Sequence, residues 1–294
     1  MPVHPPIRKA VFPVAGMGTR FLPATKSIPK EMLPIVDKPL IQYAVDEAVE
    51  AGVDTLIFVT SHKKRAILDH FEADETLQSH LLSQGKLELY EQVTNLIPQH
   101  VSIEYVIQEQ ALGLGHAVWC ARDLVGDEPF AVLLADDLIR SPQDGCLKQM
   151  VDEYHATGAG SIGVEKIPAS MTDRYGIVSV KTDESGRDYI QSIVEKPAPE
   201  LAPSRLGVVG RYILPADIFS KLESVRAGVG GEVQLTDAIA VLLASQPLLA
   251  HAFDGVRYDC GSRQGFIRAT LDYALEHEEL REDLLAYFDT ARGL

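Results

Sequence analysis

The chain has 294 residues, 46% of them hydrophobic and 23% charged, a composition typical of a globular protein that buries a sizeable core. Its formal net charge of −15 argues against a general nucleic-acid-binding protein, because binding to phosphate backbones needs a basic surface. No apolar run approaches the roughly 18 residues of a membrane span and the first residues lack a signal-peptide core, so we expect a cytoplasmic protein with no membrane partner.

Apolar runs of strand length alternate with helical patterns along the first half of the chain. Buried strands are predicted at 10–15, 55–61, 101–107 and 130–138, the last of them ending in two aspartates. Helices are predicted between residues 40 and 51, at 113–125 and at 145–157. This alternation is typical of a parallel sheet covered by helices on both faces, in which ligands bind beyond the carboxyl ends of the strands.

The second half has shorter predicted strands, at 160–167, 176–183, 189–197 and 206–215. Helices resume at about 215–224, 234–245 and 263–288. The shorter strands predict mixed or antiparallel additions to the sheet, and the absence of a repeat or linker predicts a single α/β domain. The cysteines match no metal or redox spacing, so we expect reduced, buried thiols at Cys120, Cys146 and Cys260.

The loop after the first predicted strand gathers positive charge. Residues 1–38 hold six Lys or Arg against two acidic residues, a local charge of +4, so the remainder carries −19. Gly16 and Gly18 allow backbone N–H groups to approach phosphate oxygens, and Arg20 and Lys30 add cationic donors. Composition alone leaves two interpretations open, a phosphate cradle and a solvated, proline-rich connection.

Two common phosphate-binding loops do not fit these residues. A Rossmann fingerprint needs a third glycine, where this chain has Phe21, and an acidic residue after the second strand, where it has Thr60, Ser61 and His62. A Walker-type loop needs Gly-Lys-Ser/Thr, but Gly85-Lys86 is followed by a leucine. A dinucleotide-binding dehydrogenase is therefore disfavoured, and a Walker-type protein is excluded.

The loop sequence GMGTRFLPATKSIPKEMLP, residues 16–34, resembles the GxGTRxxPxTKxxPKExLP loop of the sugar-1-phosphate nucleotidyltransferases. The resemblance runs from about residue 9 to residue 272 and is strongest to the bacterial members that use UTP. It implies a Rossmann-like, mixed and mainly parallel sheet in one domain, 1–294. Within it, the nucleotide would bind at about 9–140 and the sugar at about 141–262, followed by a C-terminal helix at 263–294.

The resemblance also implies a reaction. UTP and glucose 1-phosphate would react, with Mg²⁺ as cofactor, to give UDP-glucose and pyrophosphate by in-line attack on the α-phosphate. The residues leave two alternatives open: a related transferase that takes dTTP or another sugar, and a non-catalytic regulator that binds sugar nucleotides.

Site residues follow from the same resemblance. The nucleotide-binding positions are Ala15, Gly16, Gly18, Thr19, Gln108 and Gly113. Catalytic roles are implied for Arg20, Lys30, Asp136 and Lys196. Gln108 has the donor and acceptor groups to bind the edge of uracil, although from the residues alone a polar strand end before a glycine-rich helix start is the favoured interpretation.

The two aspartates after the strand at 130–138 suggest a metal site, because Mg²⁺ prefers few carboxylates together with phosphate oxygens and water. The resemblance assigns the metal to Asp136 and Asp259. Neighbouring residues on a strand point to opposite faces, so Asp137 is not expected to share the ion with Asp136. A capping role for Asp259, ahead of the helix at 263, stays open as the alternative.

Sugar-binding positions are implied in the second half, at Gly176, Glu195, Lys196 and Val208. Taken singly, Glu195 and Lys196 would be an exposed ion pair of little consequence. The sequence SHKKRAI departs from the family at His62 and Lys63, whose roles are undetermined, and Glu232 is left without a role. We expect a homo-oligomer, dimer or tetramer, although the apolar stripe of the last helix favours use in the core.

Overall fold

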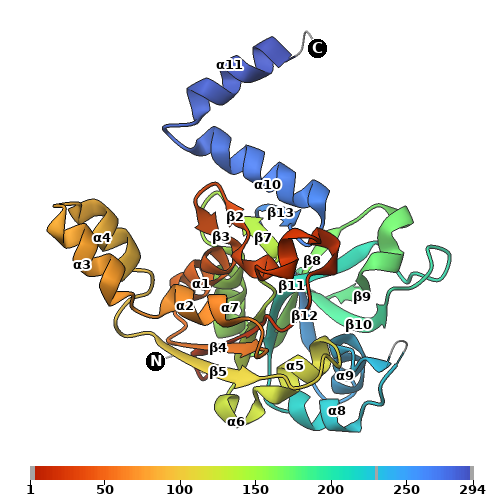
Figure 1. Ribbon diagram of the computed structural model, residues 1–294. Coiled ribbons are helices and arrows are strands. Elements are labelled where there is room, and N and C mark those ends of the chain that lie inside the picture. Colours follow the sequence, from red (N-terminus) through yellow and green to blue (C-terminus); the bar gives the residue numbers. More distant parts are fainter. Residues whose placement is uncertain (1–3, 229–230, 292–294) are drawn as a thin grey trace.

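The computed structural model describes residues 4–228 and 231–291. A nine-stranded sheet lies at its centre, in the order β5-β4-β1-β6-β11-β8-β12-β10-β9, with helices on both faces (Figure 1). The strands of this sheet are β1 (Lys9–Pro13), β4 (Thr55–Thr60), β5 (Ser102–Ile107), β6 (Phe130–Leu133), β8 (Gly160–Lys166), β9 (Gly176–Thr182), β10 (Asp188–Glu195), β11 (Leu206–Leu214) and β12 (Leu248–Ala252).

The sheet has a parallel half and a largely antiparallel half. Strands β5, β4, β1 and β6 run parallel to one another, as the sequence predicts. β11 runs antiparallel to both β6 and β8, β10 runs antiparallel to β12 and β9, and β8 and β12 are parallel. The predicted α/β class is confirmed, and the antiparallel strands extend the same sheet.

Two apolar cores lie on opposite faces of the sheet, because successive residues of a strand point to opposite sides. In β1, Ala10 and Phe12 pack toward α1 (Leu40–Glu50) and α7 (Cys146–Thr157). Val11 packs into the other core, which is formed by α5 (Leu114–Cys120), α6 (Arg122–Val125), α8 (Ile218–Ser224) and α9 (Leu235–Leu242). The helix predictions at 40–51, 145–157 and 234–245 are confirmed within a few residues.

Two predictions of local structure are wrong. The strand predicted at 130–138 ends at Leu133, and after a turn a separate strand, β7 (Asp137–Arg140), pairs with β13 (Val256–Asp259). The helix predicted at 263–288 is two helices, α10 (Arg263–Glu276) and α11 (Arg281–Ala291). At their junction Glu278 and Glu279 precede Glu282 and Asp283 by one turn, a repulsive spacing that disfavours a continuous helix. The predicted C-terminal helix, 263–294, ends outside the described residues.

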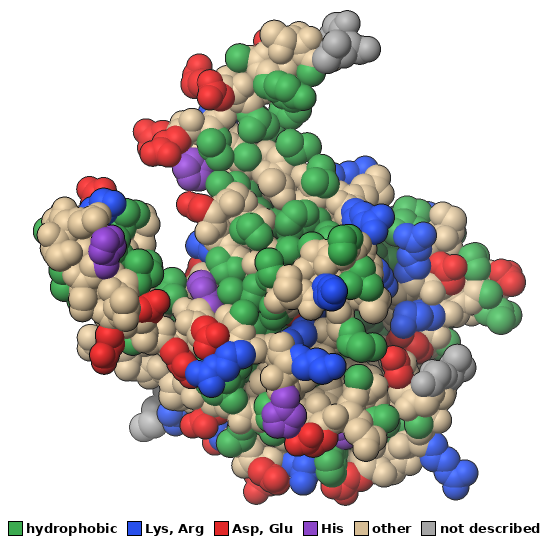
Figure 2. Space-filling model, in the orientation of Figure 1, with side chains coloured by type: hydrophobic (Ala, Val, Ile, Leu, Met, Phe, Trp, Pro, Cys, Tyr) green, Lys and Arg blue, Asp and Glu red, His purple; other side chains and the backbone are tan. Residues whose placement is uncertain are grey.

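Two helical segments project from the body of the molecule (Figure 1). One is the pair α3 (Glu75–Ser83) and α4 (Leu87–Thr94), which the sequence analysis missed and which follows α2 (Arg65–Phe71). The other is α11, which follows α10 and extends away from the body, whereas α10 itself packs against β13 and β2. Figure 2 shows hydrophobic side chains on both projections, and among the exposed ones are Leu77, Leu87, Leu285 and Tyr287. The apolar stripe of α10 is nevertheless used in a core cluster, where Ala269 is fully buried.

The segment between β1 and α1 is ordered without long elements. It contains three short 3₁₀ turns, at Thr19–Phe21, Ala24–Lys26 and Lys30–Met32, and a small hairpin of β2 (Pro34–Ile35) and β3 (Lys38–Pro39). None of the described helices is long and apolar enough to cross a bilayer. The three cysteines are free thiols; Cys146 and Cys260 are buried, and Cys120 is half-buried.

A buried ion pair joins α1 to the centre of the sheet. Arg211 of β11 is 1% exposed, and its Nε and Nη2 donate to Glu47 at 2.8 and 2.7 Å. Its Nη1 donates to the carbonyls of Gly210 at 2.9 Å and Leu134 at 3.2 Å. Arg211 therefore holds the turn that leads from β6 to Asp136 and Asp137.

We expect Glu47→Gln to lower the free energy of unfolding by about 3 kcal/mol, because it leaves the Arg211 charge buried without a carboxylate. Urea denaturation followed by circular dichroism measures the change. The matched control is Glu88→Gln on the exposed surface of α4, which should change the value by less than about 0.5 kcal/mol. Equal stability of the two variants would show that the pair does not hold this part of the sheet.

Candidate active site

The strand pair β7–β13 brings two distant aspartates together. Asp259, the last residue of β13, lies opposite Asp137, and the N–H of Cys260 donates to the carbonyl of Asp136 at 2.8 Å. A Cβ placed on Gly261 would lie 2.8 Å from Asp136 Oδ2 and 3.0 Å from Asp259 Oδ1. The two carboxylates therefore face one small space, which stays open because residue 261 has no side chain.

The neighbouring acid, Asp137, is committed elsewhere. Its Oδ1 accepts from Arg257 Nε at 2.7 Å, and its Oδ2 accepts from the N–H of Gly210 at 2.8 Å. Arg257 is largely buried; desolvation opposes its charge, but the Asp137 carboxylate and Tyr175 raise its pKa overall. Asp136 lies in the turn before β7, whereas Asp137 is the first residue of that strand. The two carboxylates therefore have different partners because of this turn, and not because side chains alternate along one strand.

Asp259 does not cap the following helix. The N-cap of α10 is Ser262, whose side chain accepts from the N–H of Gly265 at 3.1 Å. Asp259 Oδ1 instead accepts from the N–H of Gly261 at 3.1 Å. Burial, followed by the nearby Asp137 and Asp136 carboxylates, raises the pKa of Asp259. Such mutual repulsion of carboxylates is relieved by a bound cation.

The opening loop places two cations at these carboxylates. Arg20 Nη1 donates to the carbonyl of Gly261 at 3.4 Å, and Lys30 Nζ forms an ion pair with Asp136 Oδ2. Desolvation disfavours both charges of this pair; nevertheless the Lys30 ammonium lowers the pKa of Asp136, and the Asp136 carboxylate raises that of Lys30. The loop predicted to be either a cradle or a solvated connection therefore faces the predicted metal ligands.

Gly18 sets the position of Lys30. Its φ of 62° lies in the left-handed region, which glycine adopts without strain. A Cβ there would lie 3.2 Å from the Cβ of Lys30, and the carbonyl of Gly18 accepts from Thr25 Oγ1 at 2.7 Å. The two glycines of the motif thus differ, because a Cβ on Gly16 would meet nothing within 4 Å.

Behind Lys30 lies a second ion pair that the sequence analysis missed. Glu31 is 1% exposed and accepts from Lys64 Nζ at 2.7 Å. Burial raises the pKa of Glu31 and lowers that of Lys64. His62 and Lys63, whose roles the sequence left open, are exposed. Within the segment SHKKRAI, the lysine that reaches the site is therefore Lys64, the buried neighbour of Lys63.

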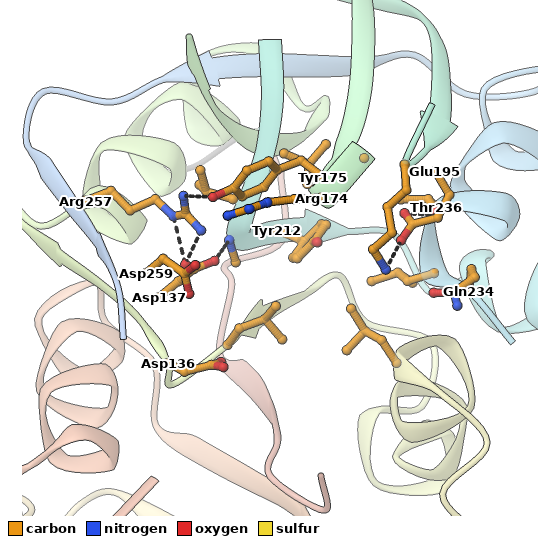
Figure 3. Close-up of a pocket in the computed structure, with 18 of the residues that line it drawn as sticks. Asp136, Asp137, Arg174, Tyr175, Glu195, Tyr212, Gln234, Thr236, Arg257 and Asp259 are labelled. Carbon is orange, nitrogen blue, oxygen red and sulfur yellow. Dashed lines mark hydrogen bonds and ion pairs between the residues drawn. The ribbon is translucent and has the colours of Figure 1, made fainter. Parts of the chain in front are cut away.

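A cavity of about 580 Å³ connects the carboxylates to the second half of the sheet. Arg20, Asp136 and Asp259 line it together with all four residues predicted to bind the sugar, Gly176, Glu195, Lys196 and Val208. Figure 3 shows the aspartates on one side of this cavity and Glu195 with Thr236 on the other. Residues from distant parts of the sequence thus share one space, as predicted.

The wall opposite the aspartates is built around a glycine. A Cβ on Gly176 would lie 2.9 Å from Thr236 Cγ2 and 3.5 Å from Glu195 Oε2, so a side chain would fill this end of the cavity. Glu195 accepts from Thr236 Oγ1 at 2.9 Å and pairs with Lys196 Nζ at 2.8 Å. The Lys196 side chain is 53% exposed, and its ammonium is available to an anion in the cavity.

The residues predicted to bind the nucleotide lie outside the lining of this cavity. The cavity lining does not include Ala15, Gly16, Gly18, Thr19, Gln108 or Gly113. The amide nitrogen of Gln108 donates to the carbonyl of Gly113 at 3.2 Å and lies 2.9 Å from His116 Nδ1. Gly113, at a φ of 95°, packs so tightly that a Cβ would lie 2.9 Å from the carbonyl of Val233. Gln108 therefore orders the loop before α5, whatever else it binds.

Several lining residues were given no role from the sequence. Arg257 and Tyr175 support the aspartate side, and Thr236 supports Glu195. Thr236 lies four residues after Glu232, which the sequence left without a role. Arg257 lies two residues before Asp259 in β13 and therefore on the same side of the strand, and this spacing was an available signal.

The residues present fit a magnesium ion. Among the described residues no group of three or more His, Cys, Asp or Glu side chains is arranged as a metal site. Mg²⁺ does not require such a group, because it is commonly held by one or two carboxylates with substrate phosphates and water. Asp136 and Asp259, facing the space left by Gly261, supply those two carboxylates.

Comparisons with known proteins identify the class. The nucleotidyl transferase family matches residues 9–276, and the chain belongs to this family. A UTP–glucose-1-phosphate uridylyltransferase of Bacillus subtilis is 50% identical over 286 residues, 96% of each chain. Among solved structures, a UTP-bound UGPase from Acinetobacter baumannii is 44% identical with a TM-score of 0.88, covering 96% of this chain and 98% of that one. A UDP-glucose pyrophosphorylase complexed with UDP-glucose is 43% identical with a TM-score of 0.83, covering 92% and 100%.

We expect Gly261→Ala to lower nucleotidyl transfer by about 10-fold or more, because its Cβ would occupy the space between the carboxylates. Steady-state pyrophosphate release measures the loss, and thermal unfolding should change little. Gly228→Ala is the matched control, since a Cβ there would meet nothing closer than 3.9 Å. An active Gly261→Ala enzyme would show that the two carboxylates do not act together.

Proposed function

We propose that the chain joins UTP and glucose 1-phosphate into UDP-glucose and pyrophosphate. The observation that carries the proposal is the shared cavity, which has the paired carboxylates Asp136 and Asp259 with Arg20 at one end and Glu195 with Lys196 at the other. Relatives with that activity in their names, covering nearly the whole chain, support the choice of UTP and glucose. The titles of two similar structures name UTP and UDP-glucose as the bound ligands of those proteins.

The reaction is a displacement at the α-phosphorus of UTP. A phosphate oxygen of glucose 1-phosphate forms the new P–O bond, and the bond to the β-phosphate oxygen breaks, so that pyrophosphate leaves with its electron pair. The attacking oxygen is already ionised and needs no general base. The difficulty is repulsion between two polyanions, and positioned cations are therefore expected to supply most of the rate enhancement.

The chain's own cations divide this task. Lys196 would hold the phosphate of glucose 1-phosphate, while Glu195, fixed by Thr236, would accept hydrogen bonds from sugar hydroxyls. Gly176 and Val208 would leave room for the hexose. On the other side, Arg20 and Lys30 would bind the triphosphate, whose negative charge spreads as the pyrophosphate departs.

The loop glycines and the Gln108 segment would bind the rest of the nucleotide. Backbone N–H groups of Ala15, Gly16, Gly18 and Thr19 would contact its phosphates and ribose. Gln108 and Gly113 would contact the uracil edge. Because the Gln108 amide nitrogen already faces the carbonyl of Gly113, its carbonyl oxygen would be the group that accepts from the base.

Asp136 and Asp259 would hold Mg²⁺, which neutralises phosphate charge and orients the α-phosphate when it is bound. Lys30 pairs with Asp136 in the structure. Lys30 would therefore turn from this carboxylate to the triphosphate as the nucleotide complex forms. Asp137 stays with Arg257 and takes no part in binding the ion.

Two further parts of the proposal concern the protein in the cell. We infer a cytoplasmic enzyme, since its substrates are small phosphorylated metabolites. We also infer a homo-oligomer, because both the α3–α4 pair and α11 expose large hydrophobic side chains that a second copy could cover.

We expect Lys30→Ala to lower turnover by roughly 10²–10³, the range observed when one transition-state donor is removed. The pyrophosphate-release assay at saturating UTP and glucose 1-phosphate measures it. Lys38→Ala, which removes a lysine that pairs with Asp46 at 2.9 Å and contacts neither Asp136 nor Asp259, is the control and should keep wild-type turnover. A Lys30→Ala enzyme within threefold of wild type would remove Lys30 from the reaction.

Substrate choice is tested by offering UTP, dTTP, ATP and CTP at matched glucose 1-phosphate. We expect the highest kcat/KM with UTP and complete loss of activity when EDTA removes the divalent ion. Preference for dTTP would assign the chain to thymidylyl transfer. Absence of pyrophosphate with every nucleotide and sugar phosphate would favour a non-catalytic sugar-nucleotide-binding protein.

A further inference from the structure

Glu31 is a buried carboxylate with two possible cationic partners. It is 1% exposed, in the short turn that begins with Lys30. Its Oε2 accepts from Lys64 Nζ at 2.7 Å. Its Oε1 is buried without a hydrogen-bond partner among the described residues and lies 4.0 Å from Lys30 Nζ. One oxygen is thus satisfied, and the other faces the lysine that pairs with Asp136.

Lys30 is therefore placed between two carboxylates that compete for it. A buried carboxylate left without a cation is strongly destabilised. If Lys64 did not neutralise Glu31, the nearest available cation would be Lys30, which is the adjacent residue and needs only a small side-chain movement. Lys30 would then be drawn back into the protein, away from Asp136 and the cavity.

The placement of Lys64 matches such a role. It follows β4 in a tight turn, where its N–H donates to the carbonyl of Ser61 at 2.9 Å and its carbonyl accepts from the N–H of Ile67 at 3.2 Å. Its side chain is 8% exposed and points inward, whereas Lys63 is exposed. Stability alone does not account for this pair, because a buried ion pair is often no more stabilising than apolar residues of the same size.

We propose that Lys64 is a positioning residue that neutralises Glu31 and so keeps Lys30 free to move from Asp136 to the phosphates of the nucleotide. This inference rests on the proposed role of Lys30. It predicts that the damage caused by losing Lys64 depends on the Glu31 carboxylate. Removing the carboxylate as well should release Lys30 and restore function, which a merely structural role of Lys64 would not produce.

The test compares Lys64→Met, the double variant Lys64→Met/Glu31→Gln and the control Lys63→Met. We measure kcat/KM for UTP, the affinity for pyrophosphate by calorimetry, and thermal unfolding. Lys64→Met should lose about 10-fold or more in kcat/KM and bind pyrophosphate more weakly. The double variant should recover to within about threefold of wild type in both readouts, and Lys63→Met should match wild type.

A folded double variant that stays as impaired as Lys64→Met overturns the proposal, and so does a Lys64→Met enzyme with wild-type kcat/KM. If Lys64→Met does not fold, the folded double variant decides: near-wild-type pyrophosphate affinity supports the inference, and a loss of 10-fold or more overturns it. Failure of the proposed function can be distinguished from failure of this inference. If the proposed function is wrong, the wild-type protein releases no pyrophosphate from UTP, but the order of pyrophosphate affinities among the variants still tests the role of Lys64.

Discussion

The short antiparallel pairing of β7 with β13 is the constraint on which the site depends. It sets Asp259 opposite Asp137 and lets the N–H of Cys260 bind the carbonyl of Asp136. Two carboxylates more than a hundred residues apart thereby face the space beside Gly261. Arg211 on the core side and Arg257 on the cavity side hold the same turn. The geometry of the two proposed metal ligands is thus built from backbone hydrogen bonds and two buried ion pairs.

Charges of opposite sign alternate through the site, which explains how an acidic chain can bind two polyanions. Lys64, Glu31, Lys30 and Asp136 form a row of cation, anion, cation and anion that runs from the protein interior to the cavity. Each charge in this row has a neighbour of opposite sign. In the proposed reaction a nucleotide with its cation would replace the last contact of the row, giving Asp136 a new counter-ion and Lys30 a new anion. The positive charge of Lys30 in the loop is therefore neutralised by Asp136, in an ion pair that an anionic ligand would replace.

Much of this organisation could be predicted from the sequence, because the fold class and the motif positions depend on local patterns. The parallel strands, the helix from Leu40 and the residues Gly176, Glu195, Lys196 and Val208 followed from apolar periodicity and a specific motif. The break in the strand after Leu133 could not be predicted from the sequence, because the apolar run is uninterrupted there. The turn is stabilised by Gly210 and Arg211, which lie on the neighbouring strand and are distant in the sequence. Lys64 was missed for a related reason, since a lysine in a sequence gives no indication of its burial.

The central claim is that Asp136 and Asp259 act on one divalent ion together with the nucleotide. A crystal structure of the complex with UTP and Mn²⁺ tests it most directly, because the anomalous signal of manganese locates the ion independently of the protein atoms. The account predicts one strong peak within bonding distance of both carboxylates and a phosphate oxygen, with Lys30 withdrawn from Asp136. A manganese ion bound by neither aspartate, with the Lys30–Asp136 ion pair intact beside the triphosphate, would contradict it.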